Sequence, residues 1–352
     1  GFRQSQPLSL LQPTITTSFL FSVGFVDVME AIAGNAVELD GAATVQRCFR
    51  HFDMDRVGDG RHLSFFEMGG VLRCREWRIA DIVYPLIEYL VQKCNLPVER
   101  LHVTYFGGGK VGATNLPPDH QAKEAYLSAG ISNDRIWPGD YSSNIWFEGA
   151  NSGTERSGIC GPNSEVFLEL RPDSNHTGPL TTPERFIELT NIVAITHRKG
   201  SENNLEQLPS PLVELAVGME RIEMVICGLP DVYQTPKLRT LAESIVSSSP
   251  MNAFSERRYL KIAVDHIRAL THLIADGGRP GPKGRGHVMR RLFRRLLHAS
   301  STLHLDARSE FPKLARVVSD VDRAINPNLT KEMQSIIEIF DREATRMSKM
   351  PV

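Results

Sequence analysis

Hydrophobic and polar positions follow different patterns in the two parts of the chain. Up to about residue 235, short runs of β-branched and aromatic residues are separated by clusters of turn-forming residues, which is typical of strands joined by loops. The strands predicted from these runs are 101–106, 164–170, 191–196 and 212–217. Helical spacing appears at 81–93 and 120–129, and residues 151–161 form a predicted loop. Because helices do not alternate regularly with strands, the pattern predicts an α+β fold in which helices flank a largely antiparallel sheet.

After about residue 240 nearly every apolar position recurs at helical spacing. The helices predicted there are 241–248, 256–275, 287–301, 311–324 and 331–348. Turn-forming residues at 228–230 and the Thr235-Pro236 pair separate this part from the preceding one. We therefore expect two domains, a sheet domain at 1–238 and a smaller, all-helical domain at 239–352.

Composition places the chain among ordinary globular proteins. It has 352 residues, of which 41% are hydrophobic and 23% charged, and this excludes disordered, collagen-like and disulfide-scaffold classes. The 40 basic and 41 acidic residues give a net charge of −1. No overall field therefore favours nucleic acid or membrane, and any such partner must be met by a local patch.

The five cysteines are widely separated, and no Cys/His cluster has metal-ligand spacing. This predicts a reducing, cytoplasmic location and no zinc site. The apolar stretch at 18–34 contains Asp27 and Glu30, so it is too short and too charged to span a bilayer, and no membrane partner is expected. Residues 19–26 have the apolarity of a signal-peptide core, but only Arg3 precedes them as a basic residue.

A basic segment lies between two of the predicted helices and continues into the second. Residues 279–295 contain seven Lys or Arg, and no acid occurs between Gly277 and Leu305. Four arginines with i, i+1, i+4, i+5 spacing share one helix face, namely Arg290, Arg291, Arg294 and Arg295. This face is either a solvated surface or a contact for the phosphate backbone of a nucleic acid.

Two arginines far apart in sequence suit a triphosphate. Arg50 precedes a polar loop, after which Arg61, His62 and Phe66 follow, and Arg221 lies far downstream. Guanidinium groups bind phosphate oxygens in a bidentate manner and also stack on flat bases. One arginine can therefore hold the α-phosphate and the other the γ-phosphate, while Phe66 supplies a stacking face for adenine.

Together these residues resemble motifs 2 and 3 of class II aminoacyl-tRNA synthetases, and the wider set is similar to the alanyl-tRNA synthetase family. Two of the matching runs are Asn144-Ile145-Trp146 and Cys160-Gly161-Pro162-Asn163-Ser164-Glu165. The other matching segments are 46–50, 61–62, 65–68, 188–193, 213–221, 265–268, 275–277 and 284–291. They follow the family's order over roughly residues 8–300, and several spaced motifs in order are far more specific than one.

The resemblance implies an adenylation site that uses ATP and Mg²⁺. The residues it implies at ATP are Arg50, Arg61, His62, Phe66, Met68, Glu165, Gly218 and Arg221. Arg50 and Arg221 would be catalytic, and Glu165 would hold Mg²⁺ through ATP. Trp146, Asn191 and Glu214 would bind a small amino acid, and the four arginines of the basic helix would face the acceptor. Displacement at the α-phosphate needs positioning and charge stabilisation rather than a protein nucleophile.

The chain also departs from the family pattern. Thr190 replaces a Trp, Ala216 a Gly, Asn163 a Cys, and Glu214 an Asp that is one methylene shorter. The editing and C-terminal domains of the family have no counterpart here, which indicates a compact, diverged relative or a fragment.

Three functions remain open on the sequence. The preferred one is activation of alanine, or a similarly small amino acid, as the adenylate, followed by transfer to a small nitrogen nucleophile. The alternatives are a catalytic fragment that charges tRNA, and a catalytically silent relative that binds RNA or a protein. The intact set of Arg50, Phe66, Glu165 and Arg221 argues against the silent relative, because drift would be expected to remove phosphate ligands first. The oligomeric state stays open.

Overall fold

The computed structural model describes residues 3–4, 7–11, 21, 41–74, 77–148, 158–172, 177–200, 203–249 and 256–348. These residues form two compact units, each assembled from separate stretches of the chain. The first, here the sheet unit, comprises the described parts of Gly1–Pro7, Gly24–Gln46 and Met68–Ile222. The second, the helical unit, comprises those of Leu8–Val23, Arg47–Glu67 and Glu223–Val352. A domain boundary at 238/239 stays a prediction.

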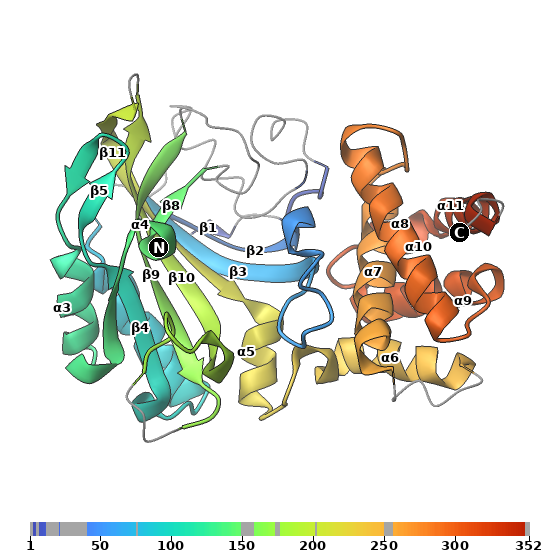
Figure 1. Ribbon diagram of the computed structural model, residues 1–352, viewed down its shortest axis with the longest axis horizontal. Coiled ribbons are helices and arrows are strands. Elements are labelled where there is room, and N and C mark those ends of the chain that lie inside the picture. Colours follow the sequence, from blue (N-terminus) through green and yellow to red (C-terminus); the bar gives the residue numbers. More distant parts are fainter. Residues whose placement is uncertain are drawn as a thin grey trace. The chain divides into compact units, whose positions relative to one another are not determined.

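Nine of the described strands form one mixed sheet of order β1-β2-β3-β11-β10-β9-β4-β7, with β8 paired to β9 (Figure 1). The bounds are β1 (Arg3–Gln4), β2 (Gly41–Phe49), β3 (Phe65–Cys74), β4 (Leu101–Phe106), β7 (Ile136–Gly139), β8 (Ile145–Phe147), β9 (Ile159–Glu169), β10 (Phe186–Lys199) and β11 (Leu205–Gly218). The pairs β3–β11, β11–β10, β10–β9 and β9–β4 are antiparallel, and β1–β2 and β4–β7 are parallel. The predicted α+β class is confirmed.

The predicted strands are all present, and three of them are longer than predicted. β4 has the predicted bounds, whereas β9, β10 and β11 extend into polar stretches because neighbouring strands supply their hydrogen bonds. β9 begins at Ile159, inside the segment predicted as a loop, and residues 151–157 lie outside the described residues. Gly161 makes this start possible, since a Cβ there would collide with the carbonyl oxygen of Ala194 at an irregularity of β10.

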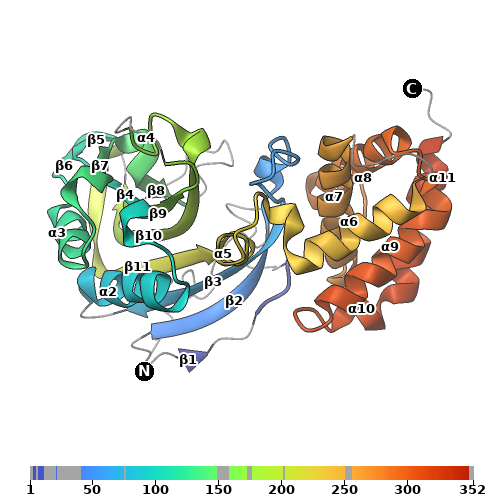
Figure 2. The ribbon, with the colours of Figure 1, turned by 90° about the horizontal axis from the view of Figure 1, so that it is seen from below.

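The two helices predicted among the strands are also confirmed. α2 (Ala80–Glu88) continues as a π-helical turn, η3 (Tyr89–Lys93), and it packs beside α3 (His120–Ser128), as Figure 2 shows. Asp119 caps α3 by accepting a hydrogen bond from the backbone N–H of Ala122 at 3.0 Å. A short helix, α4 (Tyr141–Asn144), precedes β8, and a separate hairpin is formed by β5 (Gly109–Val111) and β6 (Thr114–Leu116).

The helical unit contains the predicted helices. They are α6 (Pro236–Ser248), α7 (Arg257–Ala275), α8 (Gly284–Thr302), α9 (Ala307–Asp322) and α11 (Met333–Ser348). The short helix α10 (Asn328–Lys331) was not predicted, and α5 (Met219–Ile226) runs across the division between the units. Edge-to-face ring pairs join Phe340 to Phe293 and to Phe311, with centroids 5.3 and 5.7 Å apart. Across the described ranges, no helix is both long and apolar enough to cross a membrane.

Candidate active site

One face of the sheet gathers five of the residues expected at the site. In the strand register Met68 lies opposite Gly218, Asn191 opposite both Ala216 and Glu165, and Glu214 opposite Val193. Residues that lie directly opposite each other in an antiparallel pair project from the same face, and so do residues two apart along a strand. The side chains on this face therefore include Met68, Glu165, Asn191 and Glu214, with Gly218 beside them.

Small residues cover the middle of the same face. Gly70 pairs with Ala216, and Gly218 follows two residues later, all three half-exposed. Without large side chains above the strands, the backbone there can approach a flat ligand closely. Ala216, which departs from the family's glycine, adds only a methyl group to this surface.

Three polar side chains form a hydrogen-bonded triangle on this face. Asn191 Nδ2 donates to Glu165 Oε1 at 3.2 Å, and Asn163 Nδ2 lies 3.2 Å from Asn191 Oδ1 and 3.4 Å from Glu165 Oε1. Glu165 and Asn191 are thus brought together as expected. Sequence reasoning treated Asn163 only as a departure from the family, although its position two residues before Glu165 on one strand places both on the same face.

The Glu165 carboxyl lies in an electrostatically mixed environment. Burial raises its pKa well above the ordinary value, the nearby Glu188 carboxylate raises it further, and Arg221 opposes both effects. Arg221 is itself held by Glu188, since its Nη1 donates to the Glu188 main-chain carbonyl at 3.1 Å and to Oε2 at 3.0 Å. Glu188 was quoted in a family motif but not assigned a role, and the structure places it between the expected metal ligand and the expected γ-phosphate arginine.

Trp146 lies on β8, opposite Gly161 of β9, and is half-buried. Asn144, at the end of α4, fixes this strand from within. It is fully buried, and its Nδ2 donates to Thr104 Oγ1 and to the Asn163 carbonyl, both at 3.0 Å. Asn144 therefore joins the start of β8 to β9 and β4, on the same face as the triangle because Thr104 lies opposite Glu165.

The remaining expected ATP residues belong to the helical unit. The Arg50 guanidinium carbon lies 5.1 Å from the centre of the Phe66 ring, a cation–π distance. The backbone N–H of Arg50 donates to the Ser64 main-chain carbonyl at 2.8 Å. Arg50 and Phe66 are thus paired across the two arms of one hairpin.

Arg61 and His62 share an acidic partner in the same hairpin. Their backbone N–H groups donate to Asp59 Oδ1 at 2.8 and 2.9 Å, and the His62 ring contacts Oδ2. Partial burial favours the neutral acid, but the hydrogen bonds from His62 and from the two backbone N–H groups outweigh it and lower the pKa of Asp59. This Asx-type turn fixes the backbone from which both side chains project.

The four arginines predicted to share one helix face lie on α8 but differ in their surroundings. Arg291 Nη2 lies 2.8 Å from both carboxylate oxygens of Asp55, and Arg295 Nη1 lies 3.4 Å from Oδ1. Arg294 is exposed and Arg290 is half-buried. The lack of acids within residues 279–295 therefore does not mean that these arginines lack acidic partners, because Asp55 contacts Arg291 from 236 residues earlier in the chain.

Comparisons with known proteins agree with these motifs. The profile of the tRNA synthetases class II (A) matches residues 7–350. The cytoplasmic alanine–tRNA ligase of Drosophila melanogaster is 31% identical over 330 residues, which cover 87% of this chain and 33% of that relative. The alanine–tRNA ligase of Nitrosococcus oceani is 31% identical over 345 residues, covering 91% of this chain and 38% of the relative. The chain thus spans little more than a third of their length.

A solved structure of apo histidyl-tRNA synthetase from S. aureus is similar over 57% of this chain and 48% of its own, at 12% identity and a TM-score of 0.31. That score is too low to support detailed comparison of the folds. The match of the family profile to nearly the whole sequence, together with the ordered motifs, shows that the chain belongs to the class II (A) tRNA synthetases.

Proposed function

We propose that this chain activates alanine, or a comparably small amino acid, as the aminoacyl-adenylate and transfers it to tRNA. The observation that carries the proposal is the sheet face on which Met68, Glu165, Asn191, Glu214 and Gly218 lie together, with Arg221 attached to the same strands through Glu188. The two relatives compared above are named as alanine–tRNA ligases, which supports alanine and tRNA as substrates.

Activation joins the amino acid to the α-phosphate of ATP. A carboxylate oxygen of the amino acid attacks the α-phosphorus, and the bond from that phosphorus to the bridging oxygen of pyrophosphate breaks. Charge accumulates on the phosphate oxygens, so fixed cations are the principal catalytic requirement. We assign the α-phosphate to Arg50, the γ-phosphate to Arg221, and the outer phosphates also to Arg61 or His62.

We assign the adenine to the aromatic ring of Phe66 and to the surface formed by Met68 and Gly218. Phe66 already pairs with a guanidinium at 5.1 Å, which suits it to stacking on a planar cationic or aromatic partner. Met68 and Gly218 face each other across β3 and β11 and would contact the nucleotide through apolar surface and close backbone approach.

The surroundings of Glu165 suit Mg²⁺ held jointly with ATP. Mg²⁺ usually takes one or two protein carboxylates and completes its shell with phosphate oxygens and water. Glu165 and Glu188 are two such carboxylates, and the raised pKa of Glu165 is the mark of a buried acid next to a like charge without sufficient compensation. A bound Mg²⁺ would neutralise that charge and orient the outer phosphates.

The amino acid would be held by groups of the same face. Glu214 carries the negative charge that the substrate ammonium requires, and its extra methylene compared with the family's Asp narrows the space for a side chain. Asn191, held by Asn163 and Glu165, would orient the substrate, and Trp146 would form an apolar wall.

For the acceptor, tRNA is the better supported choice. The sequence alone favours a small nitrogen nucleophile, but the names of the two compared ligases do not support it, because both are named for tRNA. The exposed Arg294 and the neighbouring basic residues of α8 offer charge for a phosphate backbone. We also propose a cytoplasmic location, which the name of the Drosophila relative supports.

ATP–pyrophosphate exchange, measured with each amino acid in turn, tests the proposal. We expect exchange with alanine, or with another amino acid of similar size, and charging of tRNA in a second assay with the same protein. Binding of ATP without exchange for any amino acid would overturn the activation step. Exchange with alanine but no charging of tRNA would instead overturn only the acceptor.

A further inference from the structure

One face of α7 carries a row of buried ionisable side chains. Asp265, Arg268 and His272, with Asp276 at the helix end, are spaced by three or four residues and therefore share a face. Each is at most 1% exposed or has a fully buried side chain. Buried charges are costly unless they are paired, so such a row requires partners of defined position.

The partners at the first two positions come from the hairpin Arg47–Glu67, which bears Arg50 and Phe66. Asp265 Oδ1 accepts the Ser64 N–H at 2.7 Å, and Oδ2 accepts the Ser64 hydroxyl. The Arg268 guanidinium lies 4.8 Å from the centre of the Phe65 ring and 3.9 Å from a carboxylate oxygen of Glu67. The hairpin arm that contains Phe66 is thus held at Ser64, Phe65 and Glu67.

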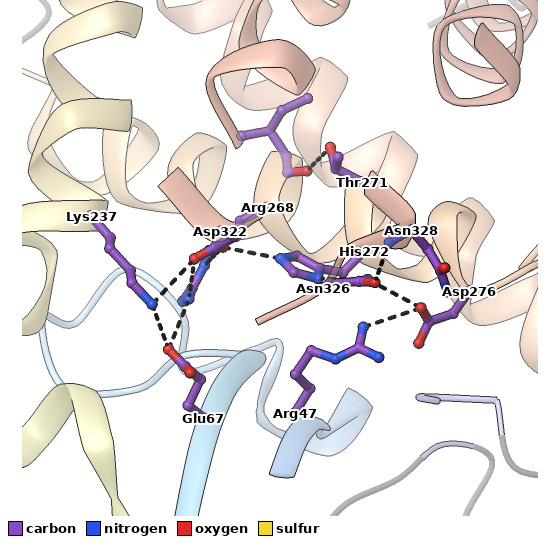
Figure 3. Close-up of polar contacts among 11 residues, drawn as sticks. Arg47, Glu67, Lys237, Arg268, Thr271, His272, Asp276, Asp322, Asn326 and Asn328 are labelled. Carbon is purple, nitrogen blue, oxygen red and sulfur yellow. Dashed lines mark hydrogen bonds and ion pairs between the residues drawn. The ribbon is translucent and has the colours of Figure 1, made fainter. Parts of the chain in front are cut away.

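His272 and Asp276 each contact one arm of the hairpin. The His272 ring stacks on Phe65 with centroids 4.2 Å apart, and Asp276 Oδ1 accepts from Arg47 Nη1 at 3.1 Å (Figure 3). Arg47 precedes Arg50 by three residues, so α7 holds the hairpin on each side of the segment between its arms.

A second layer fixes the α7 side chains from behind, as Figure 3 shows. Asp322 accepts from Arg268 Nε at 2.7 Å and lies 3.0 Å from His272 Nε2, while Asn326 Nδ2 lies 3.3 Å from His272 Nδ1. Because an amide NH₂ can only donate, Nδ1 accepts and Nε2–H donates to Asp322. Burial lowers the pKa of His272, which agrees with this neutral tautomer.

Asp265 stands nearest to Arg50 in this arrangement. The Arg50 N–H donates to the Ser64 carbonyl at 2.8 Å, so a single residue separates Asp265 from the arginine backbone. Asp265 Oδ2 also faces His266 Nδ1 at 2.8 Å, and His266 Nε2 accepts from Arg295 Nε at 2.9 Å. Asp265 therefore accepts from three donors, which the single oxygen of an asparagine cannot do.

We propose that Asp265 is a positioning residue that fixes Arg50, through Ser64, in the geometry required for the α-phosphate. This inference rests on the proposed function and extends it by assigning a role in amino-acid activation to a helix of the helical unit. Asp265 touches no substrate. Its effect is on how accurately Arg50 is placed, and small misplacements of a charge ligand reduce the rate of the chemical step more than substrate binding.

Two variants and one control test the proposal. Asp265→Asn leaves at least one donor of Ser64 or His266 facing an NH₂ group, and Ser64→Ala removes only the hydroxyl contact. Thr271→Val is the control, because Thr271 is a fully buried residue of α7 whose hydroxyl donates to the Ile267 carbonyl within the helix. The readouts are kcat and ATP KM for exchange, Tm, and deuterium uptake of the peptide that contains Arg50.

We expect Asp265→Asn to lower kcat by about 10- to 100-fold while ATP KM changes by less than about threefold. Ser64→Ala should lower kcat less than Asp265→Asn does. The double variant should have about the same kcat as Asp265→Asn, because both substitutions weaken the same contact between Asp265 and Ser64. Deuterium uptake at Arg50 should rise in Asp265→Asn but not in Thr271→Val, even if the two substitutions lower Tm by the same amount.

An equal loss of kcat in Asp265→Asn and Thr271→Val at equal Tm, or unchanged deuterium uptake at Arg50, would overturn the positioning role. If Asp265→Asn does not fold, Ser64→Ala must still show the same split between kcat and KM, and its absence counts against the proposal. Lack of exchange in the unaltered chain would overturn the proposed function instead, while the deuterium uptake still decides whether Asp265 holds Arg50.

Discussion

Arg221 donates through Nη1 to two atoms of Glu188, the main-chain carbonyl at 3.1 Å and Oε2 at 3.0 Å. The guanidinium is therefore attached to β10 by its backbone as well as by a side chain, which restricts its orientation. A phosphate that approaches Arg221 must share it with, or take it from, the Glu188 carboxylate. The pair thus keeps a phosphate ligand in place, with its charge partly compensated.

Arg221→Lys should raise ATP KM by about tenfold, which corresponds to about 1.4 kcal/mol, because an ammonium cannot reproduce the two-point geometry of a guanidinium. Steady-state exchange kinetics provide the measurement. Arg185→Lys is the matched control, since Arg185 also pairs with a glutamate of the sheet unit, Glu169, but lies outside the polar face. A similar rise in ATP KM in both variants would contradict the assignment of Arg221.

Glu165→Gln should abolish exchange and stabilise the fold at neutral pH. The pKa of Glu165 is raised, so the folded chain holds this proton more tightly than the unfolded chain does. Ionisation therefore removes stability as the pH rises from the ordinary carboxyl pKa to the raised one. The variant avoids that loss. At pH values above the raised pKa, its Tm should exceed that of the unaltered chain by about 2–4 °C, which corresponds to about 1 kcal/mol in the free energy of unfolding.

Below the ordinary carboxyl pKa the two Tm values should converge, because Glu165 is then protonated in both states of the unaltered chain. Thermal unfolding at several pH values measures this. A variant that is less stable at neutral pH would show that the ionised carboxylate stabilises the triangle with Asn163 and Asn191.

Arg50→Ala should lower kcat for exchange on the order of 10²-fold or more, as the loss of a charge ligand in the transition state does. Arg56→Ala is the control, since Arg56 is an exposed arginine of the same hairpin. Full activity of Arg50→Ala would show that the α-phosphate is held elsewhere.

Glu214→Gln should raise the KM for the amino acid by about tenfold or more with little change in ATP KM, because the variant removes the negative charge that we assign to the substrate ammonium. Glu206→Gln, an exposed position on the same strand, should change neither constant. Equal effects of Glu214→Gln on both constants would mark Glu214 as a structural residue of β11.

For the acceptor, Arg294→Ala should weaken tRNA binding, because this exposed arginine is available to contact a phosphate. The slope of the log binding constant against the log salt concentration should become shallower by about one unit. Asp55→Asn should strengthen binding, since it releases Arg291 from an exposed ion pair of modest energy. Binding isotherms across a salt series measure both effects. Unchanged binding in both variants would place the tRNA contact away from this part of α8.

Local pattern accounts for much of the fold. The helical spacing of 256–275 and 287–301 predicted α7 and α8 to within a few residues, because one apolar face must be buried wherever these helices lie. Likewise β4 could be predicted exactly from its run of apolar and β-branched residues. The ordered motifs also identified the family, since residue types at fixed spacing reflect the chemistry they perform.

Pairings between distant residues could be decided only by the tertiary structure. No acid lies near Arg291 in the sequence, yet Asp55 contacts it from 236 residues away. Asn163 was treated only as a departure from the family, but the register of β9 and β10 places it against Asn191. Asp265 carries no local sign of its contact with Ser64. Periodicity determines which face of an element is buried, whereas hydrogen bonds and ion pairs depend on which elements the folded chain brings within about 3 Å of each other.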